Sequence, residues 1–181
     1  MNKTISLLFA SAVILAPMLP FAQERLGTIV KLPGFSFKYS LETTASQSRI
    51  WSLWSDVENW NKFDTLLEYS YLVEGASFET GAIGYLKASG APRTKFELIE
   101  VDQQSAFVER LKLPLYQAID LQRYFEPGVN GVTTFTHEVN FKGVLSPLLY
   151  ALLGGTFKRE LRAVMDRLKT VAESEVLPIP N

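Results

Sequence analysis

Two hydrophobic periods divide the chain into a β-rich part and a helical end. From residue 66 to residue 142 apolar and polar side chains alternate in short runs, the spacing of half-buried strands. Turns rich in Gly, Pro, Asp or Asn separate these runs. The sequence therefore predicts six strands joined as an antiparallel meander, over residues 67–73, 83–87, 94–101, 106–113, 117–125 and 132–141.

After this series the period changes to that of an α-helix. Ser146 offers an N-cap hydroxyl, and Pro147 suits the first helical position because that position needs no N–H. A helix over residues 146–175 would be about 45 Å long. Gly154-Gly155 is expected to loosen or bend it near its start. One apolar stripe runs along it, formed by Leu149, Leu153, Phe157, Leu161, Val164, Leu168 and Val171.

Before the meander the sequence predicts one strand and two short helices. Residues 35–41 alternate as a half-buried strand does. N-cap candidates at 44–48 precede a run at helical spacing that includes Trp51 and Trp54. Asp56 is then expected to cap a second short helix that carries Trp60. The whole order predicts an α+β domain over residues 35–175, in which a curved antiparallel sheet of about seven strands wraps around the long C-terminal helix.

The N-terminus has the features of a secretory signal. Residues 1–23 combine a short basic start with an apolar core, and Ala22 suits the position before a cleavage site. The alternative is an uncleaved membrane anchor, but the apolar run is shorter than the roughly 20 residues needed to span a bilayer and contains Pro17 and Pro20. We therefore expect an exported protein, periplasmic or secreted. Residues 24–34 are expected to form a loosely structured lead-in, and residues 176–181 a C-terminal tail.

The composition argues against several classes of function, among them nucleic-acid binding and zinc-dependent chemistry. The 18 basic and 19 acidic residues leave a net charge of −1, with no basic footprint for nucleic acid. A chain without cysteine and with one histidine is poorly suited to a zinc site. It has no G-x-S-x-G elbow, phosphate-binding glycine loop or dinucleotide fingerprint. We expect no metal, cofactor or nucleic-acid partner, and the sequence leaves the oligomeric state open.

Two segments carry a family resemblance. Residues 50–63 form a helix–Asp–helix pattern with Trp60 four positions after Asp56, and residues 136–149 resemble a last strand leading into a long helix. In these segments the chain resembles the SRPBCC, or START-like, helix-grip superfamily, and within it the polyketide cyclase/dehydrase-like lipid-binding branch. The resemblance spans residues 35–172 and implies a helix-grip fold with a hollow between sheet and helix. Trp54 departs from the aliphatic residue usual at its position.

Three polar residues are candidates for chemistry in that hollow. His137 alternates with Phe135 and Val139 and should face it, and Arg123 should share that face. A turn that sets Phe125 opposite Thr133 would make His137 and Arg123 diagonal neighbours. Glu109 is the expected partner of a buried arginine. In a functional role the three residues bind an acid or stabilise an enolate. In the commoner structural role they are an ion pair beside a neutral core histidine, or Arg123 is exposed at a bulge.

The remaining candidates are hydrophobic and aromatic side chains. An aromatic wall near the short helices could stack on a ligand, although packing between helices and sheet is the commoner role. The proposed ligand-binding set is Trp54, Tyr85, Phe96, Arg123, Phe135, His137, Phe157 and Leu161. We expect an exported binding protein for an apolar small molecule or lipid. One alternative is a cyclase or dehydratase, without metal or nucleotide cofactor, that acts on a polyketide-like or other ketone-bearing substrate. Another is a scaffold protein whose hollow is filled by its own side chains, Trp54 included.

Overall fold

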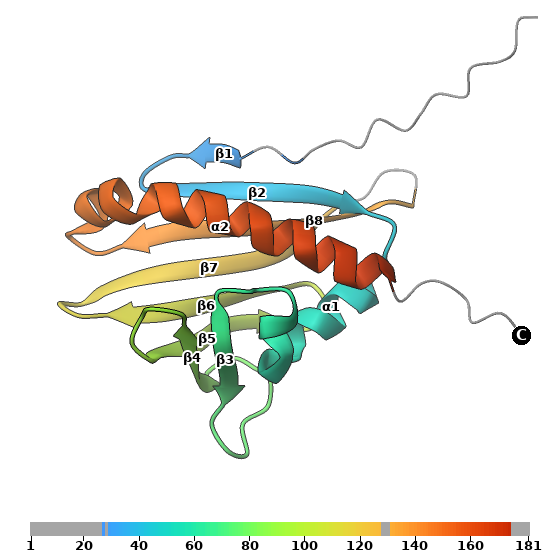
Figure 1. The fold of residues 1–181 in the computed structure, drawn as a ribbon, viewed down its shortest axis with the longest axis horizontal. Helices are drawn as coiled ribbons and strands as arrows, with labels where there is room; N and C mark the ends of the chain where they lie inside the picture. The colour runs from blue at the N-terminus through green and yellow to red at the C-terminus, as the bar shows by residue number, and fades with distance from the viewer. Residues whose placement is uncertain (1–26, 28, 128–130, 175–181) are drawn as a thin grey trace, which may run out of the picture.

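The computed structural model describes residue 27 and residues 29–127 and 131–174. Within them, one antiparallel sheet of eight strands curves around a long C-terminal helix (Figure 1). The elements are β1 (Ile29–Leu32), β2 (Ser36–Thr43), α1 (Gln47–Ser55), the 3-10 helix η1 (Val57–Lys62), β3 (Leu67–Leu72), β4 (Ile83–Ala88), β5 (Thr94–Asp102), β6 (Ala106–Leu113), β7 (Gln117–Glu126), β8 (Thr133–Lys142) and α2 (Ser146–Ser174). The expected signal segment and C-terminal tail lie outside the described residues.

The sheet order places the first two strands of the chain beside the last one. Strands β3 to β8 follow one another as the expected meander, and β2 pairs with β8 at its end, giving the order β1-β2-β8-β7-β6-β5-β4-β3. Helix α2 crosses one face of the sheet and contacts β2, β8 and α1 (Figure 1). This is the predicted α+β arrangement of a curved sheet around the last helix.

One strand lies where a loose lead-in was expected. Residues 29–32 form the edge strand β1, which pairs with β2 in the register Ile29↔Tyr39 to Leu32↔Ser36. The sheet therefore has eight strands where about seven were predicted. Hydrophobic alternation could not reveal β1, because the strand is four residues long and its burial does not alternate. The β1–β2 pair depends on the rest of the sheet for its stability, since an isolated pair of strands is at best marginally stable in water.

The short helices close one end of the structure. Ser46 caps α1, since its side chain accepts a hydrogen bond from the Arg49 backbone N–H. Asp56 is the N-cap residue of the next helix, as expected, but its side chain makes no capping bond to the backbone. Its carboxylate accepts from the Asn59 side-chain amide instead. The second helix is a 3-10 helix, and the Trp60 indole N–H donates to the Trp54 carbonyl at 2.9 Å. That bond ties the two short helices together.

Helix α2 is continuous through Gly154-Gly155, so the glycines do not end it. Ser146 is its first residue, and its hydroxyl donates to the Gly143 carbonyl where an N-cap acceptor was expected. The buried stripe includes Met165, while Leu153, assigned to the stripe from the sequence, is 37% exposed. Within the described part of the chain, no helix combines the length and apolar character that crossing a membrane requires.

Candidate ligand-binding cavity

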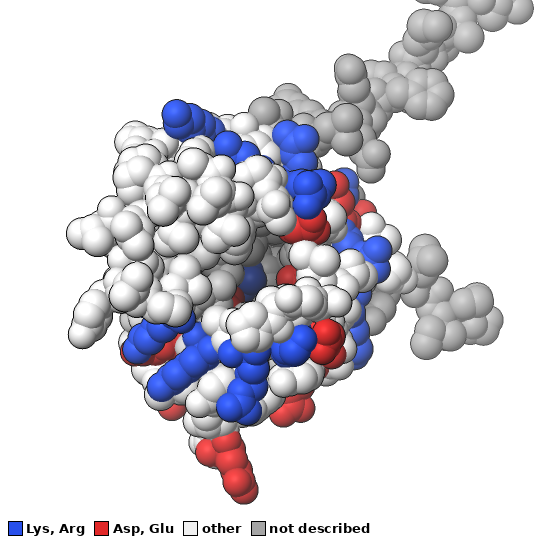
Figure 2. Space-filling model, turned by 60° about the vertical axis from the view of Figure 1, so that its left-hand side comes forward, with Lys and Arg blue, Asp and Glu red and all other residues white. Residues whose placement is uncertain are grey.

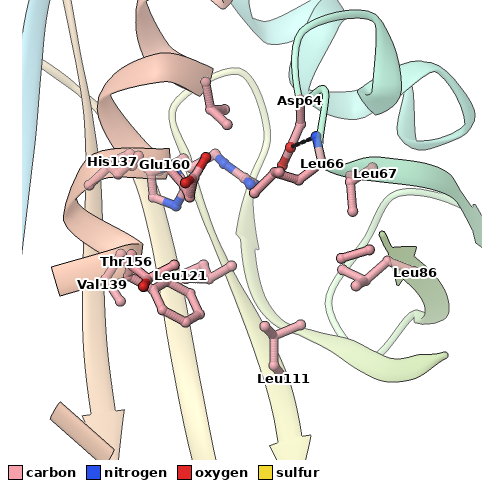
Figure 3. A pocket seen from close by; sticks show the side chains of 15 residues that line it. Asp64, Leu66, Leu67, Leu86, Leu111, Leu121, His137, Val139, Thr156 and Glu160 are labelled. Atoms are coloured by element: carbon pink, nitrogen blue, oxygen red, sulfur yellow. Dashed lines mark hydrogen bonds between the residues drawn. The ribbon is translucent and has the colours of Figure 1, made fainter. Parts of the chain in front are cut away.

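A cavity of about 220 Å³ lies between helix α2 and the sheet. Ten of its lining residues are hydrophobic: Leu66, Leu67, Leu86, Ala88, Leu111, Leu121, Val139, Phe157, Leu161 and Val164. Figure 2 shows a hollow whose rim is mostly uncharged and in which charged atoms are visible. The polar lining residues are Asp64, Arg123, His137, Thr156 and Glu160. The labelled side chains in Figure 3 come from α2, from β3, β4 and β6 to β8, and from the segment between η1 and β3.

The pairing of β7 with β8 sets Arg123 directly opposite His137. The expected register was wrong by two residues, since Phe125 lies opposite Phe135 and not Thr133. Side chains alternate between the two faces, so a shift of two leaves each residue on its predicted face and changes only its cross-strand neighbour. The two polar residues are therefore cross-strand partners and not diagonal neighbours.

Arg123 is held by an acidic partner and by aromatic rings. Its Nη1 donates to Glu109 Oε2 at 3.2 Å, and the two residues are 8% and 0% exposed. The guanidinium carbon lies 5.1 Å from the ring centre of Trp60 and 5.0 Å from that of Phe107. Stacking of this kind suits a planar guanidinium. The predicted Glu109–Arg123 pair is thus formed, with two aromatic rings beside the guanidinium.

Burial dominates the electrostatics of this pair. It raises the pKa of Glu109, and the attraction of Arg123 opposes that rise. Burial also lowers the pKa of Arg123, against the attraction of Glu109 and Asp64. An arginine starts from so high a pKa that it stays charged in proteins. Burial raises the pKa of Asp64 too, although this side chain accepts a hydrogen bond from the Leu66 backbone N–H at 3.1 Å.

His137 has no hydrogen-bond partner. It is 5% exposed, lines the cavity, and neither Nδ1 nor Nε2 contacts a donor or acceptor. Burial, followed by the nearby Arg123 charge, lowers its pKa well below 6.5. The imidazole is therefore neutral at pH 7 and offers one N–H donor and one nitrogen acceptor. Buried polar atoms usually have a hydrogen-bond partner, so two unpaired nitrogens on one side chain indicate a place where a ligand could bind.

A smaller recess of about 50 Å³ adjoins the main cavity. It shares five lining residues with that cavity, namely Asp64, Leu67, Leu86, Leu121 and Arg123. It is also lined by Glu109, whose Oε1 has no hydrogen-bond partner. The volume exceeds what a single water needs, and polar atoms lie on its wall. The recess thus lies beside the ion pair, because Glu109 and Arg123 both line it.

Four of the eight ligand-binding residues proposed from the sequence line the main cavity, namely Arg123, His137, Phe157 and Leu161. The other four do not. Trp54 packs against Phe135 in the closed end, with ring centres 6.2 Å apart. Phe96 packs under Trp60, 5.6 Å between ring centres. Tyr85 lies on the opposite face of β4 from the lining residue Leu86, with the Arg93 guanidinium 4.6 Å from its ring centre.

Sequence reasoning missed three polar lining residues. Asp64 lies in the connection after η1, where no period predicts a direction. Thr156 and Glu160 are four residues apart on α2, beside the apolar residues Phe157 and Leu161. Residues four apart lie on one face of a helix, so the flanks of the stripe were the available signal. Among the described residues, no group of three or more His, Asp or Glu side chains is arranged to hold a metal ion.

A curved antiparallel sheet closed by a long C-terminal helix, with a cavity between them, defines the helix-grip class of proteins. The sequence matches the family described as polyketide cyclase / dehydrase and lipid transport over residues 34–173, and the chain belongs to this SRPBCC-type family. The family is associated with hydrophobic ligands. No curated protein sequence matches the chain.

Solved structures share the fold at low sequence identity. A protein from Arthrobacter aurescens is 15% identical with a TM-score of 0.63, and the match covers 81% of this chain and 91% of that one. A protein from Thermus thermophilus is 13% identical with a TM-score of 0.61, covering 78% and 99%. Ara h 8.0201 is 11% identical with a TM-score of 0.60, covering 77% and 97%. At such identities the likeness establishes the fold alone.

Proposed function

We propose that this protein binds a compact apolar molecule, such as a small lipid, in the cavity between α2 and the sheet. The observation that carries the proposal is a hydrophobic cavity that also holds unpaired buried polar atoms. A ligand that fills it removes apolar surface from water, which stabilises the complex by about 25 cal/mol per Å². The few polar groups, His137 and Arg123 first, would orient the ligand.

The size of the cavity limits the ligand. Its volume of about 220 Å³ exceeds the roughly 150 Å³ of an engineered cavity that takes up benzene. It is smaller than the 300–1,000 Å³ of common ligand pockets. One or two rings or a short acyl chain therefore fit inside the cavity in this conformation, and a third ring or a longer chain would extend past its rim.

A titration with a neutral apolar dye, N-phenyl-1-naphthylamine, tests the binding. Val164 lines the cavity from α2, and V164W places an indole in that space. The exposed neighbour Ala163 provides the matched control A163W. We expect saturable fluorescence with wild type and A163W, and at least a tenfold loss of affinity with V164W. Equal binding by all three proteins, or none by wild type, would refute the proposal.

A cyclase or dehydratase activity is the second candidate, and His137 is the observation that favours it. A neutral imidazole without a partner is suited to moving a proton on a bound ketone. Arg123 is less available to polarise a carbonyl because Glu109 already accepts from it. If the protein is an enzyme, H137A abolishes turnover of a polyketide-like substrate. If it is a binding protein, no turnover occurs and H137A only weakens retention.

We further propose export through the segment of residues 1–23. The support is its basic start, apolar core and Ala22 before the cut. The test is the intact mass of the protein recovered from fractionated cells. Export predicts a chain that begins near Gln23 outside the cytoplasm. A full-length chain in the membrane fraction would instead establish the anchor.

A further inference from the structure

We propose that the cavity selects a ligand with a neutral head group that both donates and accepts a hydrogen bond, a hydroxyl above all, and disfavours carboxylates. The inference rests on the proposed binding function and adds the chemical class of the ligand. It follows from which polar atoms of the cavity are already paired and which are not.

The positive charge of Arg123 already has a carboxylate partner inside the protein. Glu109 supplies a carboxylate at 3.2 Å from inside the protein, and both side chains are buried. Asp64 and Glu160 also line the cavity and bring two more acidic groups to the same space. Figure 3 shows both carboxylates directed toward the interior of the cavity. A ligand carboxylate would be a further negative charge among three acidic residues and one arginine.

His137 presents the opposite situation, since both of its ring nitrogens are buried and without a partner. In the neutral ring one nitrogen donates and the other accepts. A hydroxyl matches either nitrogen, whichever tautomer is present. A carboxylate matches only the N–H. An ammonium matches only the acceptor nitrogen, and it would lie beside Arg123, which is directly opposite His137 in the sheet.

Leaving a buried polar group unpaired is costly, so the match at His137 affects affinity. An ether of the same length accepts but cannot donate, and it should bind about fivefold more weakly than the alcohol. A charged head group must also lose its hydration inside a mostly hydrophobic cavity. Octanoate and octylammonium should therefore bind at least tenfold more weakly than octan-1-ol.

Competition against N-phenyl-1-naphthylamine measures these differences with four probes of similar length: octan-1-ol, heptyl methyl ether, octanoate and octylamine at pH 7.5. We expect octan-1-ol to displace the dye at the lowest concentration. H137F should reduce the alcohol-to-ether preference to about onefold. Y85F is the control, because it removes a hydroxyl from the other face of the sheet and should keep the wild-type preference.

The outcomes separate the two proposals. If the dye does not bind wild type, the binding function itself is wrong. If the dye binds but octanoate or octylamine displaces it as well as octan-1-ol does, the hydroxyl preference is wrong and the binding function stands. An alcohol-to-ether preference that survives in H137F would likewise overturn the role given to His137.

Discussion

The buried pair between Glu109 and Arg123 should contribute strongly to the stability of the fold. At 3.2 Å, and with the effective dielectric constant of about 20 that suits protein sites, the attraction is about 5 kcal/mol. The E109L substitution removes it and leaves a guanidinium that is 8% exposed. Breaking such a pair costs about 3–5 kcal/mol. Because Asp64 also attracts Arg123, we expect a loss near 3 kcal/mol.

Urea unfolding at pH 7, followed by circular dichroism, measures this loss. Two further variants serve as controls, one for an exposed ion pair and one for the unpaired guanidinium. K112M breaks the Lys112–Glu97 pair on the neighbouring strands β6 and β5, whose lysine side chain is 51% exposed, and it should cost less than about 1 kcal/mol. The double variant E109L/R123M replaces the buried pair by hydrophobic side chains and should recover most of the stability.

Two results would contradict the strong attraction between Glu109 and Arg123. If E109L costs no more than K112M, the buried pair does not carry the strong attraction assigned to it. If the double variant is no more stable than E109L alone, the loss does not come from an unpaired guanidinium. In that case changed packing around Trp60 and Phe107 would be the cause.

Two further predictions concern pH and packing. His137 has a lowered pKa in the folded state, so the unfolded chain binds its proton first, and stability is lost as the pH falls below about 6.5. The difference in unfolding free energy between wild type and H137N should change by up to about 1.4 kcal/mol per pH unit below that point, and a constant difference would contradict the assignment. G84A should lower stability by about 1–3 kcal/mol, because a Cβ there meets the Phe96 ring and lies 2.7 Å from the Tyr71 carbonyl. A melting temperature equal to that of wild type would refute this.

Most of the fold could be predicted from the sequence because its periods are long and regular. Strands β3 to β8 begin and end within two residues of the predicted bounds, since one face of the sheet is buried and the alternation is sustained. The apolar stripe of α2 was equally regular over most of the helix, so the helix could also be predicted. Strand β1 could not be found this way, because four residues without alternation carry no period.

For the site, the sequence predicted which face of the sheet each side chain occupies, but not where along the strand it lies. Alternation indicated the face of Glu109, Arg123 and His137, and the structure places all three on the inner side. Alternation does not indicate the position along a strand. Phe135 shares that face with His137 but lies two residues nearer the closed end, where Trp54 fills the space. Asp64 belongs to a connecting segment, whose side-chain directions depend on the finished fold.

Methyl NMR tests the central claim, ligand binding inside the cavity, most directly. The protein is labelled at Leu and Val methyl groups and titrated with N-phenyl-1-naphthylamine. Binding in the cavity predicts saturable shifts at Leu121, Val139 and Val164, which line it. Leu148 and Leu152, exposed at the start of α2, should not shift. Shifts confined to those exposed leucines, or no saturable shift at all, would contradict the account.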